Sequence, residues 1–310
     1  MSKKIIFMGT PLFAVPILKS LYQNGYPISV VYTQPPQKSN RGYKINKSPI
    51  QSISETLNID FRSPKTLQDN KEEYQFLKEL NADLAIVVAY GQIIPKNFLT
   101  LTKKGFINIH GSILPNWRGA APIQRSIMNL DTETGISVMK IEEKLDSGPV
   151  SNVYKIKLHN NDNAQEVSEK LSNLAAEKIL DNIDDILEDK AKFVNQDHTK
   201  VSYAKKIDKN EGKINWNDEA KIIIGKINGL FPIPGAFFNF HGERYKILKA
   251  EIGNGIGQAG EVISDKLEVA CNNNKSIKII EIQRQGKKPQ KIGEFMLGSQ
   301  IKKGSIISNV

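Results

Sequence analysis

The sequence predicts an α/β protein in which a doubly wound, Rossmann-like domain is followed by a small β-barrel of the OB-like type. Three observations support this fold class. Strand and helix signals alternate over residues 1–189, as in a sheet with helices on both faces. The continuous apolar run at 84–89 suits a strand buried within a parallel sheet. After residue 235, short strand signals alternate with turns, as in a small barrel.

The elements of the first domain follow in chain order. A strand at 4–8 leads through Gly9-Thr10-Pro11 into a helix over 12–23, because proline fits the first turn of a helix. A later helix runs to about residue 188, and Asp162 or Asn163 can cap its start. Another helix is expected near 120–130. The remaining strands of this domain are expected at 28–32, 84–89, 106–110, 136–141 and 150–158.

The second domain opens with a helix and continues with short strands. The helix starts at 217–219, buries Ile222, Ile223 and Ile227, and stops at the prolines of 231–235. The strands, each bounded by turn residues, are expected at 236–240, 245–250, 260–263, 268–270 and 277–283.

Charge and polarity divide the chain. Its formal net charge is +10, and residues 205–310 hold most of the excess, with 18 Lys and Arg against 11 Asp and Glu. A basic domain attracts nucleic acid through phosphate contacts, although a solvated lysine-rich surface has the same composition. A polar stretch without sustained periodicity precedes this part. We therefore expect one domain at 1–189, a linker at 190–206 and a second domain at 207–310.

Composition also excludes several classes of protein. The single cysteine, Cys271, rules out an intrachain disulfide and four-cysteine metal sites, and it suits the cytoplasm. No metal is expected. No apolar run of about 18 residues predicts a membrane span. Gly9-Thr10-Pro11 lacks the Gly-x-Gly-x-x-Gly pattern, so NAD is not expected. Nothing indicates self-association, and we expect a monomer.

The strand at 106–110 carries the most informative pair of side chains. Side chains alternate along a strand, so Asn108 and His110 share one face while Ile107 and Ile109 face the core. An amide beside an imidazole, with a carboxylate supplied from elsewhere, suits acyl-type transfer. A lone histidine beside a strand is more often structural, which is the alternative interpretation.

Six segments together resemble the folate-dependent formyltransferases, and within that family the members that act on methionyl-tRNA. They are NIHGSILPNWRGAAPIQ at 108–124 with LDSG at 145–148, IFMGTPLFA at 6–14, TQP at 33–35, VVAYG at 87–91 and SYAKK at 202–206. The similarity runs from the N-terminus into the C-terminal part and is looser after about residue 250.

The resemblance implies a reaction and a catalytic set. The α-amino nitrogen of methionyl initiator tRNA would attack the formyl carbon of 10-formyltetrahydrofolate, and the product would serve translation initiation. Asn108 and His110 would donate hydrogen bonds to the oxygen that becomes negative. Asp146 would pair with His110 and help to carry the proton that leaves the amine. By itself, Asp146-Ser147-Gly148 reads as an ordinary turn.

The resemblance also implies a folate-binding surface. An apolar loop wall fits a flat pterin, and backbone groups can read its polar edge. Two segments would form this surface, and for the second of them, which contains Tyr90, Gly91 and Ile94, an ordinary strand-to-helix loop is the alternative. The positions that match the family are Ser112, Ile113, Leu114 and Pro115, followed by Tyr90, Gly91 and Ile94.

A basic loop at 34–48 is placed to grip a phosphate backbone. It contains four cations and no acid, and Pro35, Pro36 and Gly42 favour an irregular course. In the family, the matching loop enters the tRNA acceptor stem, which implies tRNA contacts for Arg41 and Lys44. Lys206 resembles another family lysine near the bound tRNA end. A surface loop charged only for solubility is the alternative.

Three other functions remain open from the residues. A formyltransferase that acts on an amino-sugar nucleotide would use the same catalytic set, but it needs neither the basic loop nor a basic second domain. A nucleic-acid-binding protein on a retired enzyme fold has no use for Asn108, His110 and Asp146 together. A folate hydrolase would release formate without tRNA.

Overall fold

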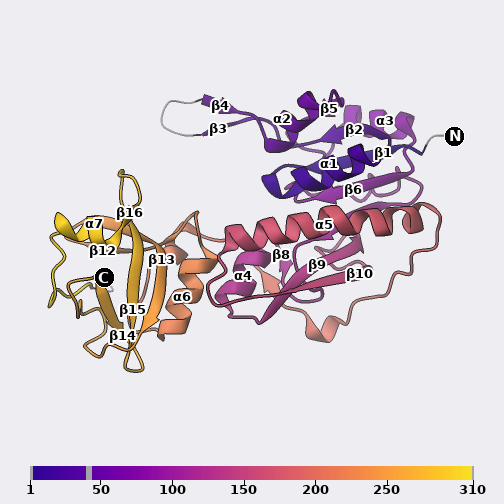
Figure 1. Ribbon diagram of the computed structural model, residues 1–310. Coiled ribbons are helices and arrows are strands. Elements are labelled where there is room, and N and C mark those ends of the chain that lie inside the picture. The colour runs from indigo at the N-terminus through magenta and orange to yellow at the C-terminus, as the bar shows by residue number, and fades with distance from the viewer. Residues whose placement is uncertain (1–2, 40–43, 309–310) are drawn as a thin grey trace. The chain divides into compact units, whose positions relative to one another are not determined.

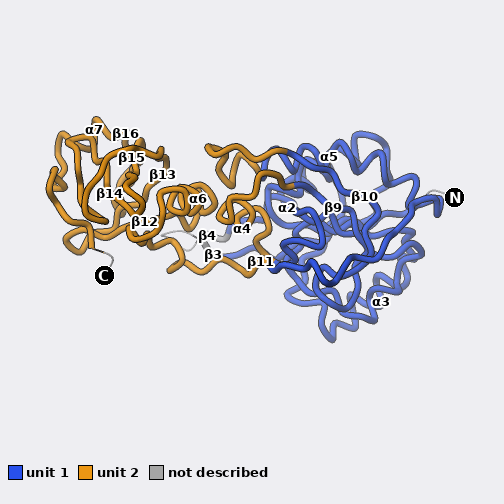
Figure 2. The backbone as a smooth tube through the Cα atoms, turned by 90° about the horizontal axis from the view of Figure 1, so that it is seen from below, with its two compact units in different colours: residues 1–119, 135–156, 168–203 blue, residues 120–134, 157–167, 204–310 orange. Residues whose placement is uncertain are grey.

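The computed structural model describes residues 3–39 and 44–308. The chain forms two compact units, neither of which is one continuous stretch of sequence (Figure 2). Unit 1 takes residues 1–119, 135–156 and 168–203, and unit 2 takes residues 120–134, 157–167 and 204–310. The chain therefore passes between the two units more than once.

A seven-stranded sheet forms the centre of unit 1. The strands from β7 to β5 run parallel to their neighbours, whereas β9 runs antiparallel to β7. Strands β1 and β6 are buried along their whole length, as predicted for a sheet covered on both faces. The predicted α/β fold class is confirmed. In spatial order the strands are β10 (Val150–Lys157), β9 (Glu133–Lys140), β7 (Phe106–His110), β6 (Leu84–Val88), β1 (Ile5–Gly9), β2 (Ile28–Tyr32) and β5 (Phe61–Arg62) (Figure 1).

Side chains are buried on both faces of strand β1. Ile6 and Met8 belong to a core cluster with Tyr32 of β2 and Leu77 of helix α3 (Lys71–Leu80). Ile5 and Phe7 point to the other face and are also fully buried. The strand is therefore apolar at every position, which explains its continuous hydrophobic run.

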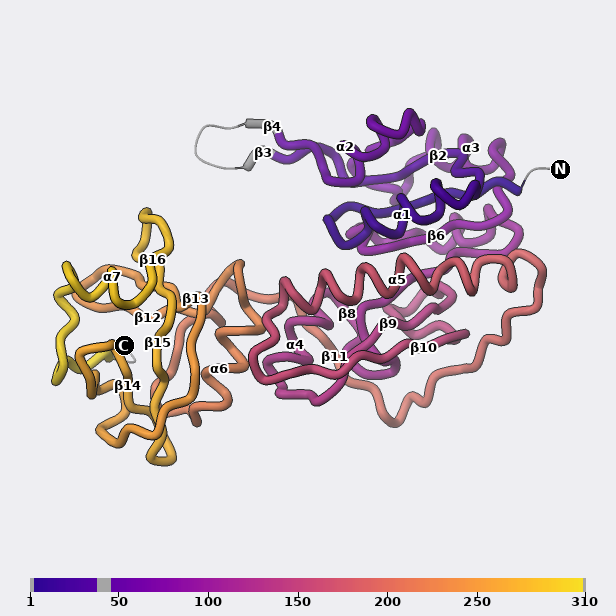
Figure 3. Tube along the Cα trace, in the orientation of Figure 1, coloured from indigo at the N-terminus to yellow at the C-terminus, as the bar shows by residue number. Residues whose placement is uncertain are grey.

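Helices α1 (Val15–Gln23) and α5 (Ala164–Leu187) lie side by side along unit 1 (Figure 3). The Ser20 hydroxyl donates to the Ala176 carbonyl oxygen at 2.6 Å, and the Ser172 hydroxyl donates to the Phe13 carbonyl oxygen at 2.6 Å. These bonds tie the helix that follows β1 to the last helix of the domain. Both helices were predicted.

Capping residues explain where three helices begin. Ser48 accepts a backbone N–H of the first turn of α2 (Pro49–Thr56) at 2.9 Å, and Asn70 does the same for α3 at 3.1 Å. No element is predicted from the sequence over residues 49–83, so both α2 and α3 were missed. At α5, Asn163 and Glu166 each accept the other's backbone N–H, which confirms the predicted start.

The strand order reverses at β1, because β2 lies on one side of it and β6 on the other. In open α/β sheets, ligands bind in the crevice at such a reversal, at the carboxyl ends of the strands. Three loops meet there: the Thr10 hydroxyl donates to the Tyr90 carbonyl oxygen at 2.7 Å, and the Gln34 backbone N–H donates to the Thr10 hydroxyl at 3.2 Å. The topology therefore indicates a ligand site beside the Tyr90 loop.

Unit 2 contains a curled antiparallel sheet with helix α6 (Ala220–Gly229) packed against it. Its core includes Trp216, Phe238, Ile247 and Ile277. The predicted small-barrel architecture is confirmed in this curled form (Figure 1). The remaining elements are β12 (Ala236–Phe240), β13 (Glu243–Gly253), β14 (Glu268–Cys271), β15 (Lys275–Arg284), β16 (Gln290–Lys291) and α7 (Ile292–Leu297).

Two predictions for this unit are wrong. Residues 260–263 form no strand; Glu261 and Val262 make only isolated bridges, to Ile306 and Val269. Ile222 is 38% exposed, because the buried stripe of α6 runs through Ile223, Ile224 and Ile227 instead. Helix α4 (Pro122–Met128) contacts α6 within this unit.

The predicted irregular course of the basic loop is wrong at its base. Strands β3 (Gln37–Ser39) and β4 (Lys44–Asn46) pair there as an antiparallel hairpin. The other short elements are η1 (Leu12–Ala14), η2 (His198–Lys200), η3 (Lys209–Gly212) and the paired strands β8 (Arg118–Gly119) and β11 (Tyr203–Ala204). Within residues 3–39 and 44–308, no helix has both the length and the apolar character needed to cross a membrane.

Candidate active site

Strand β7 presents Asn108 and His110 on one face, as the alternation predicted. His110 is 6% exposed and ends the strand. Its Nε2 lies 3.0 Å from the Trp117 carbonyl oxygen. A carbonyl oxygen can only accept, so this contact needs a hydrogen on Nε2. The imidazole is therefore oriented by the loop that follows its own strand.

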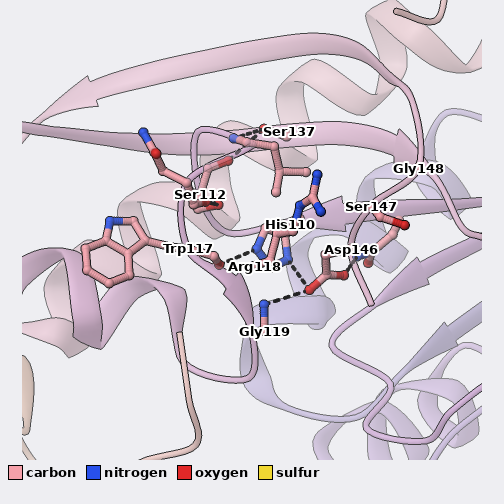
Figure 4. Close-up of polar contacts among 12 residues, drawn as sticks. His110, Ser112, Trp117, Arg118, Gly119, Ser137, Asp146, Ser147 and Gly148 are labelled. Atoms are coloured by element: carbon pink, nitrogen blue, oxygen red, sulfur yellow. Dashed lines mark hydrogen bonds and ion pairs between the residues drawn. The ribbon is translucent and has the colours of Figure 1, made fainter. Parts of the chain in front are cut away.

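Asp146 is the hub of the site (Figure 4). One carboxylate oxygen accepts the Gly119 backbone N–H at 2.9 Å and lies 3.6 Å from Nδ1 of His110. The other accepts from Nδ2 of Asn108 at 3.5 Å. Asn108, His110 and the Gly119 main chain thus meet at a carboxylate that lies 27 or more residues further along the sequence, so the three predicted catalytic residues come together here.

The backbone around Asp146 is specialised. Asp146 has φ +47°, a left-handed conformation that Asp tolerates better than most residues. Two residues later, a Cβ added to Gly148 would lie 2.1 Å from the Lys140 carbonyl oxygen. Only glycine lets the turn approach β9 this closely. The sequence LDSG therefore forms a turn that packs closely against β9 of the sheet.

We expect Gly148→Ala to destabilise the protein by about 1–3 kcal/mol, because the added methyl group overlaps a main-chain oxygen that cannot rotate away. The activity of the site should fall with it, since Asp146 lies in the same turn. Urea unfolding measures the first effect. Gly293→Ala is the matched control, as a Cβ there meets nothing within 4 Å. An unfolding midpoint equal to that of the wild type would contradict the expectation.

The loop that follows His110 is held by a buried serine of β9. The Ser137 hydroxyl donates to the Ser112 carbonyl oxygen at 2.7 Å and accepts the Leu114 N–H at 3.1 Å (Figure 4). Ser112 and Leu114 are buried, whereas Ile113 and Pro115 are half-buried. The Ser112 hydroxyl donates within the loop, to Asn116. The apolar side chains of Ile113 and Pro115 are therefore the more open part of this predicted folate segment.

The second predicted folate segment offers its main chain more than its side chains. Tyr90 is buried in the core, where desolvation raises the pKa of its hydroxyl. Its carbonyl oxygen faces Thr10 and Gln34 instead. Gly91 is exposed with φ +83°, and Ile94 packs against the core. Ile93, in the same loop, is 84% exposed.

Several contact residues of the site were not predicted. Gly119 and Trp117 lie inside the quoted motif, but nothing in their residue types indicates that their main-chain groups contact Asp146 and His110. Ser137 and Gln196 lie far away in the sequence and carry no motif. Only the folded chain brings them to the site.

Family models match both parts of the chain. A model described as formyl transferase matches residues 3–183, and one described as formyl transferase, C-terminal domain matches residues 206–300. The chain belongs to the formyltransferase family.

Curated relatives of this formyltransferase match over the whole chain. The methionyl-tRNA formyltransferase of Pelagibacter ubique (strain HTCC1062) is 68% identical over 310 residues, covering 100% of each chain. That of Chelativorans sp. (strain BNC1) is 39% identical and covers 98% of this chain and 99% of its own. Both far exceed the identity at which a shared fold alone would be inferred.

Solved structures show how widely the fold is used. The sugar 3N-formyl transferase WlaRD, solved in the presence of dTDP and 5-N-formyl-THF, has a TM-score of 0.69 at 21% identity, covering 93% of this formyltransferase and 100% of its own chain. HypX from Aquifex aeolicus, solved with tetrahydrofolic acid, has a TM-score of 0.66 at 15% identity over 96% of this chain and 47% of its own. At these identities the likeness concerns the fold alone.

The basic residues selected from the sequence are placed unequally in this formyltransferase. Arg41 lies outside the described residues, and Lys44 starts β4 with its side chain outside the description. Lys206 is exposed in unit 2. Its main chain is fixed by Arg125, which donates to the Lys205 and Lys206 carbonyl oxygens and forms an ion pair with Glu211 at 2.6 Å.

A cavity of about 530 Å³ in unit 2 is lined by cations and apolar side chains. Arg244 stacks on the Phe237 ring at 3.9 Å, and Lys209 and Lys246 line the same cavity. Burial lowers the pKa of Lys246, and the nearby Arg244 lowers it further. None of the three cations forms an ion pair within the described part of the chain. Among the described residues, no group of three or more His, Cys, Asp or Glu side chains could hold a metal ion.

Proposed function

We propose that this formyltransferase transfers the formyl group of 10-formyltetrahydrofolate to the α-amino group of methionyl initiator tRNA. The product, formylmethionyl-tRNA, would supply translation initiation. The observation that carries the proposal is 68% identity over the full length of a methionyl-tRNA formyltransferase. Asn108 and His110 of β7 meet the Asp146 carboxylate, and this set supplies the chemistry for it.

The reaction needs hydrogen-bond donors for an oxygen and an acceptor for a proton. When the neutral amine adds to the formyl carbon, the formyl oxygen becomes negative, and Asn108 and His110 would donate to it. The His110 Nε2 hydrogen bonds to the Trp117 carbonyl in the structure, so this contact must be exchanged for substrate. Asp146 would keep the imidazole oriented and take part in moving the proton from the amine to the folate nitrogen. That nitrogen leaves as tetrahydrofolate when its bond to the formyl carbon breaks.

The residues at the carboxyl ends of β1, β6 and β7 fit a folate. Exposed Leu12 and Ile93 follow neighbouring strands at the point where strand order reverses, and isolated large apolar side chains there suit a flat ring. We assign the pterin to the main chain of Tyr90 and Gly91 and to the wall formed by Ile94, with Ser112, Ile113, Leu114 and Pro115 opposite. Folate supplies the formyl group, and the protein supplies orientation.

We assign the tRNA backbone to basic residues of both units. Arg41, Lys44 and Lys206 would contact the acceptor end, and the cation-lined cavity of unit 2 would hold a further phosphate. A guanidinium stacked on an aromatic ring beside two lysines, with no carboxylate from residues 3–39 or 44–308 paired to them, suits a nucleotide better than a free surface. Phosphate contacts give affinity but cannot select the initiator, which needs contacts to the methionyl end and to bases.

Arg244→Ala should weaken tRNA use without altering folate use. We expect the KM for methionyl initiator tRNA to rise several-fold and the slope of log affinity against log salt to fall by about 1, as for one lost phosphate contact. The measurement is a salt series of tRNA binding. Lys19→Ala, an exposed lysine of α1, is the control for lost charge. An unchanged slope would remove the cavity from the tRNA surface.

The assay that tests the proposed function compares acceptors. Methionyl initiator tRNA, methionyl elongator tRNA and a dTDP-linked amino sugar are each incubated with 10-formyltetrahydrofolate and the enzyme. We expect transfer to the initiator tRNA only. Transfer to the amino sugar instead would overturn the proposal in favour of the alternative substrate class, and tRNA binding without any transfer would indicate a binding protein.

We further infer that the protein acts as a monomer in the cytoplasm. Initiator tRNA is used there, and a single thiol suits a reducing compartment. Cys271 is buried, and burial raises its pKa to about 11. It should therefore react with thiol reagents only after unfolding.

A further inference from the structure

The segment 193–202, which we call the strap, crosses unit 1 beside the active site. At one end, Val194 and Val150 exchange backbone hydrogen bonds at 2.9 Å in both directions. At the other end, the Ser202 hydroxyl accepts the Trp117 N–H, and its carbonyl oxygen accepts the Arg118 N–H, both at 2.9 Å. The strap is thus attached to β10 and to the loop that orients His110.

Gln196 is the buried centre of the strap, with 8% of its surface exposed. Its Oε1 accepts from Nε and Nη2 of Arg118 at 3.1 and 2.7 Å. Its Nε2 donates to the carbonyl oxygens of Asp146 and Gly148 at 2.9 and 2.7 Å. The full hydrogen-bonding capacity of the amide is used, half of it on the turn that carries the catalytic carboxylate.

Arg118 is buried to 4% exposure without a carboxylate partner in the described part of the chain. Besides Gln196, its guanidinium has one other hydrogen-bond partner among the described residues, Nδ1 of His198, at 3.3 Å. A buried cation with neutral partners is costly, and apolar packing would fill the same space more favourably. Stability alone therefore does not explain this arrangement.

The contacts close into a ring around the catalytic carboxylate. Gly119, the neighbour of Arg118, donates its N–H to the Asp146 carboxylate, while Gln196 links the Arg118 side chain to the Asp146 main chain. Both the carboxylate and the main chain of Asp146 are thus linked to the dipeptide Arg118-Gly119. This leaves Asp146 little freedom to rotate away from Asn108 and His110.

We propose that Gln196 is a positioning residue, which with Arg118 fixes the Asp146 carboxylate against Asn108 and His110. The proposal rests on the proposed function for its kinetic readout. It also gives the strap a role in the reaction, although the strap lies within the stretch that its composition marks as a linker.

Gln196→Glu is the sharpest variant. A carboxylate keeps an acceptor for Arg118, but it places an oxygen without hydrogen against two carbonyl oxygens, so it should push the Asp146 turn away. We expect kcat to fall about 10–100-fold, as for a misplaced catalytic group, with both KM values within about twofold. Gln23→Glu, an exposed glutamine at the end of α1, makes the same charge change and should be neutral.

A double-mutant cycle separates positioning from structural damage. If Gln196 acts through Asp146, Gln196→Glu should cost little in an Asp146→Asn background. Equal losses in both backgrounds, or an unchanged kcat in the single variant, would overturn the proposal. Should the glutamate variant not fold, Gln196→Met has a similar length without hydrogen bonds, and the same cycle applies.

A structural readout keeps the test independent of the reaction. Hydrogen exchange of the Gly119 amide, followed by NMR, reports its bond to the Asp146 carboxylate. We expect this amide to exchange at least about tenfold faster in the Gln196 variants, and no faster in Gln23→Glu. Unchanged exchange of the Gly119 amide would overturn the proposal, whether or not the wild-type protein transfers a formyl group. Failure of the wild-type protein to transfer a formyl group would count against the proposed function alone.

Discussion

Replacing His110 by alanine is expected to lower kcat for formyl transfer about 10³-fold, the range found when an oxyanion donor or a general acid–base group is removed. The imidazole is buried and contacts the Trp117 carbonyl on one side and Asp146 on the other. Its removal takes away both a donor and the partner of the carboxylate. Single-turnover formylation of methionyl initiator tRNA at saturating folate measures this loss.

The control for this variant is His159→Ala, because His159 is exposed and its hydrogen bonds to described residues, both with Asp162, use its main chain alone. That variant should keep wild-type kinetics. If His110→Ala kept more than about a tenth of wild-type activity, the imidazole would be structural. That is the alternative interpretation of a lone histidine beside a strand.

Asp146→Asn is expected to lower kcat by about 10²–10⁴-fold with little change in folding. Asparagine tolerates the same left-handed backbone, so the turn should persist. The amide lacks the negative charge, and half of its hydrogen-bonding atoms donate rather than accept. It therefore cannot accept at both oxygen positions from Gly119, Asn108 and His110.

Thermal unfolding of the same preparation would show whether the turn persists. Asp60→Asn makes the same chemical change at an exposed position and should behave as wild type. Full activity of Asp146→Asn would show that the charge is dispensable, and the proton would then have to leave the amine by a route that avoids this carboxylate.

The predicted part of the site depends on local patterns. Asn108 and His110 share a face because side chains alternate on any strand, and the strand itself follows from its apolar neighbours. The place of Asp146 follows from likeness to a family rather than from spacing. Periodicity alone misassigned Ile222, since three consecutive isoleucines, at 222–224, do not show which of them face the sheet.

The unpredicted part depends on contacts between distant segments. Gln196 stands in a polar stretch with no periodicity, and it lies beside Asp146 because the strap is bonded to Val150 at one end and to Trp117 and Arg118 at the other. Tyr90 lies in the predicted folate loop, yet its side chain turns into the core, because the residue before it, Ala89, has φ +47°. A residue type and a position in the sequence do not reveal such turns of the backbone.

The proposed folate-binding and catalytic roles of unit 1 both follow from the way the parallel strands of its sheet end at one edge. Parallel strands β6, β1 and β7 end at one edge, so the proposed folate loop and the proposed catalytic pair are neighbours by topology. The antiparallel strand β9 then returns along β7, with Ser137 opposite His110. That return places both Ser137, which anchors the loop after His110, and the Asp146 turn beside β7.

The most direct measurement is the stoichiometry of a single turnover, with tetrahydrofolate and formylmethionyl initiator tRNA quantified from the same quenched samples. We expect one tetrahydrofolate to be released for each formylated tRNA, at equal rates, with both products lost together in His110→Ala. Release of tetrahydrofolate and formate without formylated tRNA would contradict a transferase and identify a folate hydrolase.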